Sequence, residues 1–517
     1  MNKRLLIKSI YIACFGRGNP PWLPIHFAPA RAGTGACPYM SAAFLAFVFL
    51  IFSVSSSFAA SPRTMVFSPV EFHPPKAERA VLENGMVLYL LEDHELPLVQ
   101  INAMIRTGSV YEPADKIGLA GLTGAVMRTG GTASMSGDAL DEELEFMAAE
   151  LGSSIGPDAG IASLDILAKD LDRGLTLFAD MLMHPAFPQD KLDLAKQQAL
   201  ESIRRRNDNP AGIASRQFRK RVYGEDHPLA RESTVETIGR ITRADLVAFH
   251  SRDYHPDAVI LSLSGDFEKK EMIEKIRRAF AGWPQGRIDR PSLPPVPDAF
   301  KPSVNLVEKD ISQTHLRIGH LGIRQDDPDY FAVSLLNDIL GGGGFRSRLF
   351  KTVRTEGGLA YSVGSTFTPG NLEPGMFVAY GETKAGSTYQ AISAIEREIQ
   401  RIRTAPVKEE ELRLAKDSFL NSFVFSFSDP AMIVDRQASL EYYGLPADFL
   451  ERFRDSVVHV TRQEILDVAQ KHLQPDGLIV LAVGRPDRFD RPLSGLGILN
   501  VIPLDPTGEP VGSKRPQ

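Results

Sequence analysis

Hydrophobic and polar positions follow the same order in two successive parts of the chain: strand-like alternation, then helical spacing, then a closing apolar strand. In the first part the pattern predicts strands at 86–93, 98–106 and 258–264 and helices at 140–151, 167–183 and 190–206. In the second part it predicts strands at 304–309, 315–323, 361–367, 376–382 and 478–483 and helices at 330–340, 385–403 and 407–426. Asn84-Gly85 starts the first of these strands, and the first two strands are expected to pair antiparallel. This order predicts an α+β fold in which helices pack on a largely antiparallel sheet.

The two parts also match residue by residue. Residues 192–196, LDLAK, are echoed 220 residues later by residues 412–416, LRLAK. The same offset matches seven further residues of 200–217 with residues of 420–437, after which the register shifts by one. So many matches in one order indicate two homologous halves of about 200 residues each, an ordinary domain size.

Composition shifts set the expected boundaries. The predicted organisation is a signal or leader at 1–59, an N-terminal segment at 60–79, an N-terminal domain at 80–283, a proline-rich linker at 284–302, a C-terminal domain at 303–484 and a Pro/Gly-rich tail at 485–517. The linker contains six prolines. Since proline fixes φ and removes a donor, the linker should be extended and semi-rigid.

The N-terminus predicts export. Residues 42–54 form an apolar run that is too short to span a membrane, and Ser57 and Ala59 place small residues at the −3 and −1 positions of a signal-peptidase site. We expect cleavage near Ala59, a periplasmic or otherwise exported protein, and no stable membrane span after cleavage. An uncleaved anchor is the alternative, and Met40 is an alternative start.

Charge and cysteine content narrow the classes of function. The leader carries five basic and no acidic residues, so its removal changes the formal charge from −6 to −11. An acidic mature chain argues against nucleic acid as a partner. Cys14 and Cys37 both lie in the leader, so the mature chain has neither a disulfide nor a thiolate nucleophile.

The stretch 337–367, NDILGGGGFRSRLFKTVRTEGGLAYSVGSTF, is the most distinctive part of the second half. Four glycines precede a segment with apolar residues at helical spacing, and Gly357-Gly358 predicts the end of that helix. The β-rich residues that follow predict a strand beginning near Tyr361. Arg354 is therefore placed at the end of a helix and Tyr361 at the start of a strand.

This LGGGGFRSRLF and R-x6-Y pattern resembles the second half of the pitrilysin/insulinase family of zinc peptidases, in the branch that contains the mitochondrial processing peptidase. In that family an Arg and a Tyr hold the substrate peptide near the scissile carbonyl, and the resemblance places them at Arg354 and Tyr361. It also implies the duplicated α+β fold. The alternative is that Arg354 is a solvated cation at a helix end and Tyr361 a core residue.

The first half contains GLAGLTGAVMRTGGT, residues 118–132, which resembles the metal-binding frame of the same family. Active members carry H-x-x-E-H here, with two histidines one helical turn apart and a glutamate that activates water. The resemblance places the histidine positions at Gly121 and Ala125, the base position at Gly124, and the third ligand at Glu201. The first three cannot bind a metal or move a proton, and Glu201 alone would hold zinc too weakly. No cofactor is therefore expected on this chain.

The two glycines carry a helical cost that the sequence leaves unexplained. Gly121 and Gly124 each cost about 1 kcal/mol relative to alanine inside a predicted helix. They either loosen the helix or permit close approach of another backbone. Both alternatives stay open from sequence.

The resemblance implies a catalytically silent subunit of a heterodimeric zinc peptidase. Its partner would be a homologous subunit bearing H-x-x-E-H and the zinc, and Arg354 and Tyr361 would bind an extended peptide. The alternative is a non-proteolytic binding or scaffold protein of the same fold. A third reading, an active peptidase with unorthodox ligands, is the weakest because no second coordinating side chain is found near Glu201.

Overall fold

The computed structural model describes residues 76–286, 290–296 and 301–505 of the 517-residue chain. The predicted signal peptide, its cleavage near Ala59, the alternative start at Met40 and the polar end of the predicted tail lie outside the described residues. Within the described ranges, none of the helices combines the length and the apolar character that a membrane span requires.

The N-terminal half contains the first sheet and its helices. Its strands are β1 (Glu78–Val81), β2 (Val87–Glu92), β3 (Leu98–Ile105), β4 (Glu150–Ile155), β5 (Gly160–Leu167) and β6 (Val259–Gly265). Its helices are α2 (Leu119–Thr129), α3 (Gly137–Met147), α4 (Leu171–Met183), α5 (Gln189–Arg205), α6 (Pro210–Tyr223), α7 (Val235–Arg240), α8 (Arg243–Asp253) and α9 (Lys269–Ala279).

The C-terminal half repeats the plan. Its strands are β7 (Ser303–Glu308), β8 (Gln313–Leu321), β9 (Ala360–Thr368), β10 (Met376–Lys384), β11 (Ile479–Gly484) and β12 (Leu499–Val501). Its helices are α10 (Tyr330–Asn337), α11 (Thr388–Ile402), α12 (Glu409–Phe423), α13 (Pro430–Tyr442), α14 (Phe449–His459) and α15 (Arg462–His472). β12 lies in the segment predicted as a tail, where it adds an edge strand beside β7.

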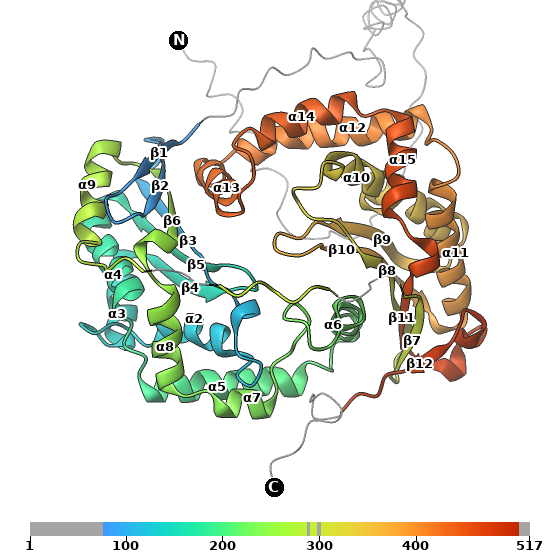
Figure 1. Cartoon of the computed structure of the whole chain (residues 1–517), viewed down its shortest axis with the longest axis horizontal. Helices are drawn as coiled ribbons and strands as arrows, with labels where there is room; N and C mark the ends of the chain where they lie inside the picture. Colours follow the sequence, from blue (N-terminus) through green and yellow to red (C-terminus); the bar gives the residue numbers. More distant parts are fainter. Residues whose placement is uncertain (1–75, 287–289, 297–300, 506–517) are drawn as a thin grey trace, which may run out of the picture. The chain divides into compact units, whose positions relative to one another are not determined.

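The two sheets share one topology (Figure 1). Their orders are β1-β2-β6-β3-β5-β4 and β12-β7-β11-β8-β10-β9. In each sheet a central strand, β6 or β11, pairs in parallel with one neighbour and antiparallel with the other. The remaining pairs are antiparallel apart from β12 with β7. The common order confirms the predicted α+β fold with two homologous, largely antiparallel halves.

The predicted antiparallel pairing of residues 86–93 with 98–106 is wrong. β6 lies between β2 and β3, parallel to the former and antiparallel to the latter. The reason is its burial: six of its seven residues, Val259 to Ser264, are buried. A strand that is buried on both faces needs cover on both faces, which a place inside a sheet rather than at its edge provides.

One helix of each half packs against the sheet of the other half. α6 and α13 are repeat equivalents, since Pro210 and Pro430 open them after the capping side chains of Asn209 and Asp429. α6 contacts β8 and β11 of the second sheet, whereas α13 contacts β2, β3 and β6 of the first (Figure 1). The apolar face of α6 joins residues of β7 and β11 in one buried cluster. The two halves are therefore packed together through an exchanged pair of helices.

Polar contacts fix α13 on the first sheet. The Tyr442 hydroxyl donates to the carbonyl oxygens of Ile105, at 3.0 Å, and Asp158, at 2.9 Å. Glu441 accepts two hydrogen bonds from the guanidinium of Arg79, at 2.6 and 2.7 Å, and one from the Tyr89 hydroxyl at 2.6 Å. These charge-assisted bonds are shorter and stronger than neutral ones, so they tie the end of α13 to β1 and β2.

Glu441 should make this packing sensitive to acid. The hydrogen bond from Arg79 lowers the pKa of Glu441, with partial burial opposing and Tyr89 adding to the effect. A lowered folded-state pKa gives stability that is present above the ordinary glutamate pKa and lost as pH falls through the folded value. Glu441→Gln is expected to lower the free energy of unfolding by about 1 kcal/mol near pH 7. Denaturant unfolding from about pH 7 to about pH 3.5 should show this difference shrinking toward zero; a difference independent of pH would contradict the assignment.

Candidate functional site

The glycine-rich segment of the second half turns sharply into β9. We predicted one helix that ends at Gly357-Gly358; the chain instead forms a single 3-10 turn at Gly344–Arg346 and a π-helix at Phe350–Glu356. The predicted end is confirmed, since Gly358 has a φ of 59°. Its amide donates to the Arg354 carbonyl at 3.0 Å. Tyr361 follows as the second residue of β9, so the turn brings Arg354 and Tyr361 together.

Arg354 lies between two aromatic rings. Its guanidinium carbon is 4.6 Å from the Phe350 ring centroid and 5.4 Å from that of Tyr361. Phe350 in turn packs edge-on against Phe345, with centroids 4.7 Å apart. Cation–π contacts of this kind hold a guanidinium in one orientation. Tyr361 is 73% exposed, so the alternative that it belongs to the core is wrong.

The side-chain donors of Arg354 and Tyr361 are available to a ligand. In the part of the chain that the structure describes, neither the guanidinium nor the phenol hydroxyl makes a hydrogen bond or an ion pair with another residue. The neighbouring arginines differ. Arg346 pairs with Asp338 at 3.2 Å, and Arg348 binds Glu411 through two nitrogens at 2.9 and 2.8 Å, which fastens the segment to α12. Of these three arginines, Arg354 alone has no acidic partner among the described residues.

The predicted metal-site positions lie on α2. Gly121 and Ala125 are exposed and one turn apart, whereas Gly124 is buried. A Cβ on Gly124 would lie 2.9 Å from the Ile155 nitrogen and 3.0 Å from Ser154, both backbone atoms of β4. A Cβ on Gly121 would meet nothing within 4 Å. Gly124 therefore permits the close approach of a strand backbone, which was one of the two alternatives left open by the sequence. At position 121 no packing contact requires a glycine.

Glu201 forms an ion pair within its own helix. It lies on α5, which packs on α2, but its carboxylate accepts from Arg205 Nε at 2.6 Å and its side chain is 49% exposed. Among the described residues one group of three metal-capable side chains lies close together, and it is in the other half: Asp327, Asp329 and His472. Lys471 and His472 already contact Asp329 at 2.6 and 2.7 Å. The residues at the α2 positions therefore do not fit zinc.

Glu112 supports α2 and was missed at the sequence level. This buried carboxylate accepts from the backbone nitrogens of Gly118, at 3.1 Å, and Ala120, at 2.5 Å, at the start of the helix. Burial raises the pKa of Glu112, while those two bonds and Arg231 oppose the rise. A carboxylate on free amides at a helix N-terminus stabilises the helix. The site frame thus remains firmly held although its ligands are absent.

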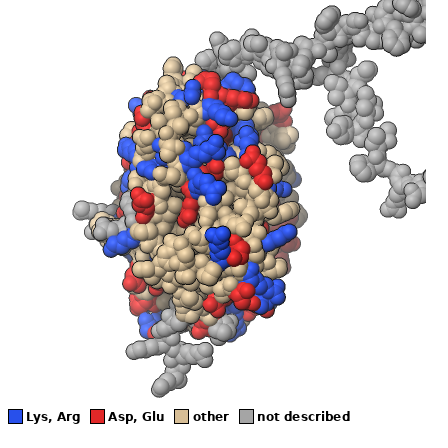
Figure 2. All heavy atoms as spheres, turned by 90° about the vertical axis from the view of Figure 1, so that its right-hand side faces the viewer, with Lys and Arg blue, Asp and Glu red and all other residues tan. Residues whose placement is uncertain are grey.

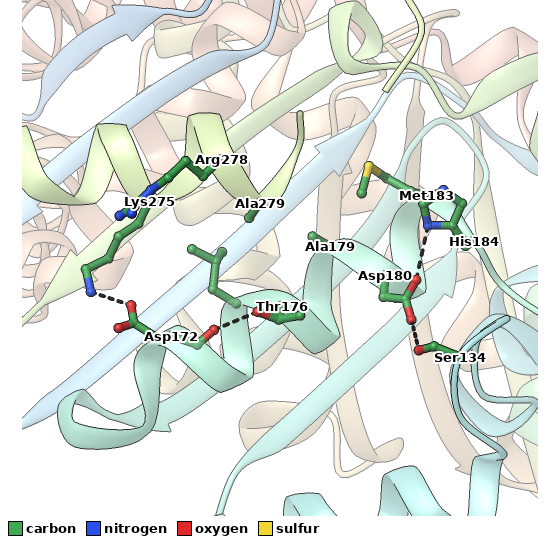
Figure 3. A pocket seen from close by; sticks show the side chains of 11 residues that line it. Ser134, Asp172, Thr176, Ala179, Asp180, Met183, His184, Lys275, Arg278 and Ala279 are labelled. Carbon is green, nitrogen blue, oxygen red and sulfur yellow. Dashed lines mark hydrogen bonds and ion pairs between the residues drawn. The ribbon is translucent and has the colours of Figure 1, made fainter. Parts of the chain in front are cut away.

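A further cavity is distinct from both sites. It has a volume of about 600 Å³ and lies between α4 and α9 (Figure 3). Ser134 and His184 both bond the carboxylate of Asp180, at 2.6 and 3.1 Å (Figure 3). In a nucleophilic triad the imidazole lies between the hydroxyl and the acid, whereas here the acid lies between the other two. The cavity therefore offers no activated serine.

The surface charge is mixed. Figure 2 shows one face on which basic and acidic side chains are interspersed, without a broad field of one sign. Such a face gives little long-range steering of a charged polymer. Recognition is therefore expected to depend on local groups such as Arg354.

The duplicated α+β halves, the glycine-rich turn and the empty ligand frame together define a peptidase-like protein. Comparison with known proteins gives the family. The family profile described as Insulinase (Peptidase family M16) matches residues 88–232, and that described as Peptidase M16 inactive domain matches residues 240–419. A crystal structure of a peptidase M16 inactive domain from Pseudomonas fluorescens is 30% identical, with a TM-score of 0.73, over 80% of this chain and 98% of that one. This chain belongs to peptidase family M16.

Other relatives extend the comparison. An uncharacterized zinc protease of Rickettsia bellii is 26% identical over 65% of this chain and 80% of its own length. The periplasmic protease PqqL of Escherichia coli is 14% identical, with a TM-score of 0.68, over 87% of this chain and 51% of that one. At that identity the likeness to PqqL shows the fold alone. Family membership with no ligand or base at the α2 positions is consistent with a catalytically inactive peptidase-like protein.

Proposed function

We propose that this chain is the subunit without zinc of an exported two-chain peptidase, and that it supplies Arg354 and Tyr361 to an extended peptide. The observation that carries the proposal is the pair itself, a half-buried guanidinium beside an exposed phenol, whose donors make no hydrogen bond within the described residues. Gly121, Gly124 and Ala125 supply neither ligand nor base. The metal chemistry is therefore assigned to a homologous partner that bears H-x-x-E-H.

The chemistry of the pair suits a peptide carbonyl. Arg354 is always charged and donates in a fixed plane, and the Tyr361 hydroxyl adds a second donor. When a peptide bond is attacked, its carbonyl oxygen gains negative charge, and donors that bind it more strongly in that state lower the barrier. Phe350 holds the guanidinium plane beforehand, so little orientational freedom is lost on binding.

Export is part of the proposal. Its support is the sequence of residues 1–59, with the apolar run and the small residues before the expected cleavage at Ala59. The fold is shared with the periplasmic protease PqqL of Escherichia coli. A cleaved chain would meet its partner and its peptides outside the cytoplasm.

Purification alone and with a zinc-bearing homologue tests the proposal. The mature chain alone is expected to hold no stoichiometric zinc and to cleave no peptide. Co-expressed with an H-x-x-E-H homologue, it is expected to form a one-to-one complex that holds the metal and cleaves. Native mass measurement, metal analysis and a peptide-cleavage assay report these results.

Two outcomes would contradict it. One tightly held zinc per isolated chain would show that ligands exist which the α2 positions do not supply. A persistent homodimer that ignores the homologue would favour the non-proteolytic binding or scaffold role instead.

A further inference from the structure

A second cavity lies within the C-terminal half and is lined by residues of α10, α12, α13 and α14. Its volume is about 470 Å³. Six aromatic side chains contribute to its wall: Tyr330, Phe419, Phe423, Tyr443, Phe449 and Phe453. Several of these rings pack on one another, with centroids 5.6 Å apart for Tyr330 and Phe449 and 5.7 Å apart for Phe419 and Phe453. The wall is thus an aromatic surface suited to a large apolar group.

Polar groups complete the lining. Arg436 is exposed and, in the described parts of the chain, has no hydrogen bond or ion pair. Its charge opposes the rise in the pKa of Tyr330 that burial causes, which places the guanidinium near that ring. The side-chain amide of Gln325 also lines the cavity and makes no hydrogen bond to the described residues. A cation and an amide therefore accompany the aromatic wall.

The internal repeat shows what this arginine lacks. Arg436 on α13 is the equivalent of Arg216 on α6, 220 residues earlier. Arg216 is paired with Glu232, with nitrogen and oxygen 2.8 Å apart, and its side chain is only 18% exposed. Its guanidinium also donates to the Arg206 carbonyl and to Asn207. Arg436 on α13 has no acidic partner of this kind among the described residues, so a carboxylate is the group that its site would accept.

We propose that this cavity binds the C-terminal residue of a peptide that ends in an aromatic or large aliphatic side chain. The terminal carboxylate pairs with Arg436, and the side chain packs on the rings of Tyr330, Phe423 and Phe449. Gln325 offers a donor and an acceptor to the adjoining peptide group, which a simple fatty acid would not use. The site is independent of the proposed peptidase role, because neither Arg354 nor Tyr361 lines it.

Calorimetric titration of the purified mature chain with four probes tests the proposal. The probes are N-acetyl-Leu-Phe as the free acid, its C-terminal amide, N-acetyl-Leu-Ala as the free acid, and decanoate. The Phe acid is expected to bind about 10-fold or more tightly than its amide, because a charge-assisted bond is lost in the amide. It should also bind about 10-fold more tightly than the Ala acid, which leaves the aromatic wall uncovered.

Variants assign the effect to the cavity. Arg436→Gln should lower affinity for the Phe acid about 10-fold, to that of the amide, and leave the amide unchanged. Arg452→Gln is the matched control, since Arg452 lies on α14, is 60% exposed and pairs with Asp448. Phe453→Leu should weaken both Phe probes, with unfolding measured to confirm that the fold is kept.

The overturning results are equally direct. Equal affinity for acid and amide would remove the role of Arg436, and binding of none of the probes would remove the site. Loss of affinity in Arg452→Gln as large as in Arg436→Gln would make the effect a general one of charge. Decanoate binding as tightly as the Phe acid, with the same dependence on Arg436, would assign the cavity to fatty acids and overturn the peptide terminus.

Discussion

Replacing Arg354 with alanine is expected to lower kcat/KM of the assembled two-chain peptidase by about 10²- to 10³-fold. This is the loss found when one donor to a developing oxyanion is removed, equivalent to about 2.7 to 4 kcal/mol. Tyr361→Phe, which removes only the hydroxyl, should act in the same direction. Folding and assembly should stay near normal, because the described residues include no hydrogen-bond partner for either donor.

The control is an ion-paired arginine on the surface of the same half. Arg413 lies on α12, is 59% exposed and pairs with Asp417, so Arg413→Ala should leave cleavage unchanged. Rates with a peptide substrate and native mass of the complex are measured for each variant. Variants of Arg354 and Tyr361 that cleave as well as the parent would refute the site; variants that fail to assemble would make the pair structural.

The second large expected effect is that two glycine-to-alanine substitutions in α2 change the free energy of unfolding in opposite directions. Gly121→Ala is expected to raise the free energy of unfolding by about 0.5 to 1 kcal/mol, since alanine is the better helix former and the added methyl meets open space. Gly124→Ala gains the same helix propensity, yet its methyl would lie 2.9 Å from a backbone nitrogen of β4. Overpacking against a backbone typically costs about 1 to 3 kcal/mol, so this variant should be destabilised.

Denaturant unfolding of the two variants beside the parent decides the matter. If both alanines stabilise, the close approach of α2 to β4 is not a constraint. If both destabilise, the helix needs glycine for another reason. The same geometry has a further consequence. A glutamate at position 124 would require movement of β4, whereas side chains at positions 121 and 125 would enter solvent.

The duplication and the broad fold could be predicted because both depend on patterns that the chain repeats. The strands β4 and β5 escaped prediction for a physical reason. Residues 150–160 are rich in glycine and serine, which have low β-propensity, and β4 is stabilised by its contacts with β5 and α2 rather than by its own residues. β6 lies between β2 and β3 because it pairs with strands that are distant from it in sequence. A short turn motif does not predict such pairing.

Part of the candidate site could likewise be predicted from local sequence features, and part could not. The positions of Arg354 and Tyr361 followed from Gly358 and the strand after it, which are local features. Arg354 stacks on Phe350 within a π-helix, and helical spacing alone does not distinguish that winding from an α-helix. The support of α2 by Glu112 joins residues through buried backbone amides, so sequence spacing offered only a carboxylate six residues before Gly118.

The exchange of α6 and α13 has a consequence for the history of the chain. A single ancestral half would have carried a helix whose apolar face had no sheet of its own to cover, and a sheet face without its helix. Two copies could satisfy both surfaces by reciprocal swapping, which is a low-cost route to a symmetric dimer. Fusion of two such genes would then make the exchange permanent within one polypeptide. The present chain is in this sense a covalently closed dimer, whose two members were later free to diverge.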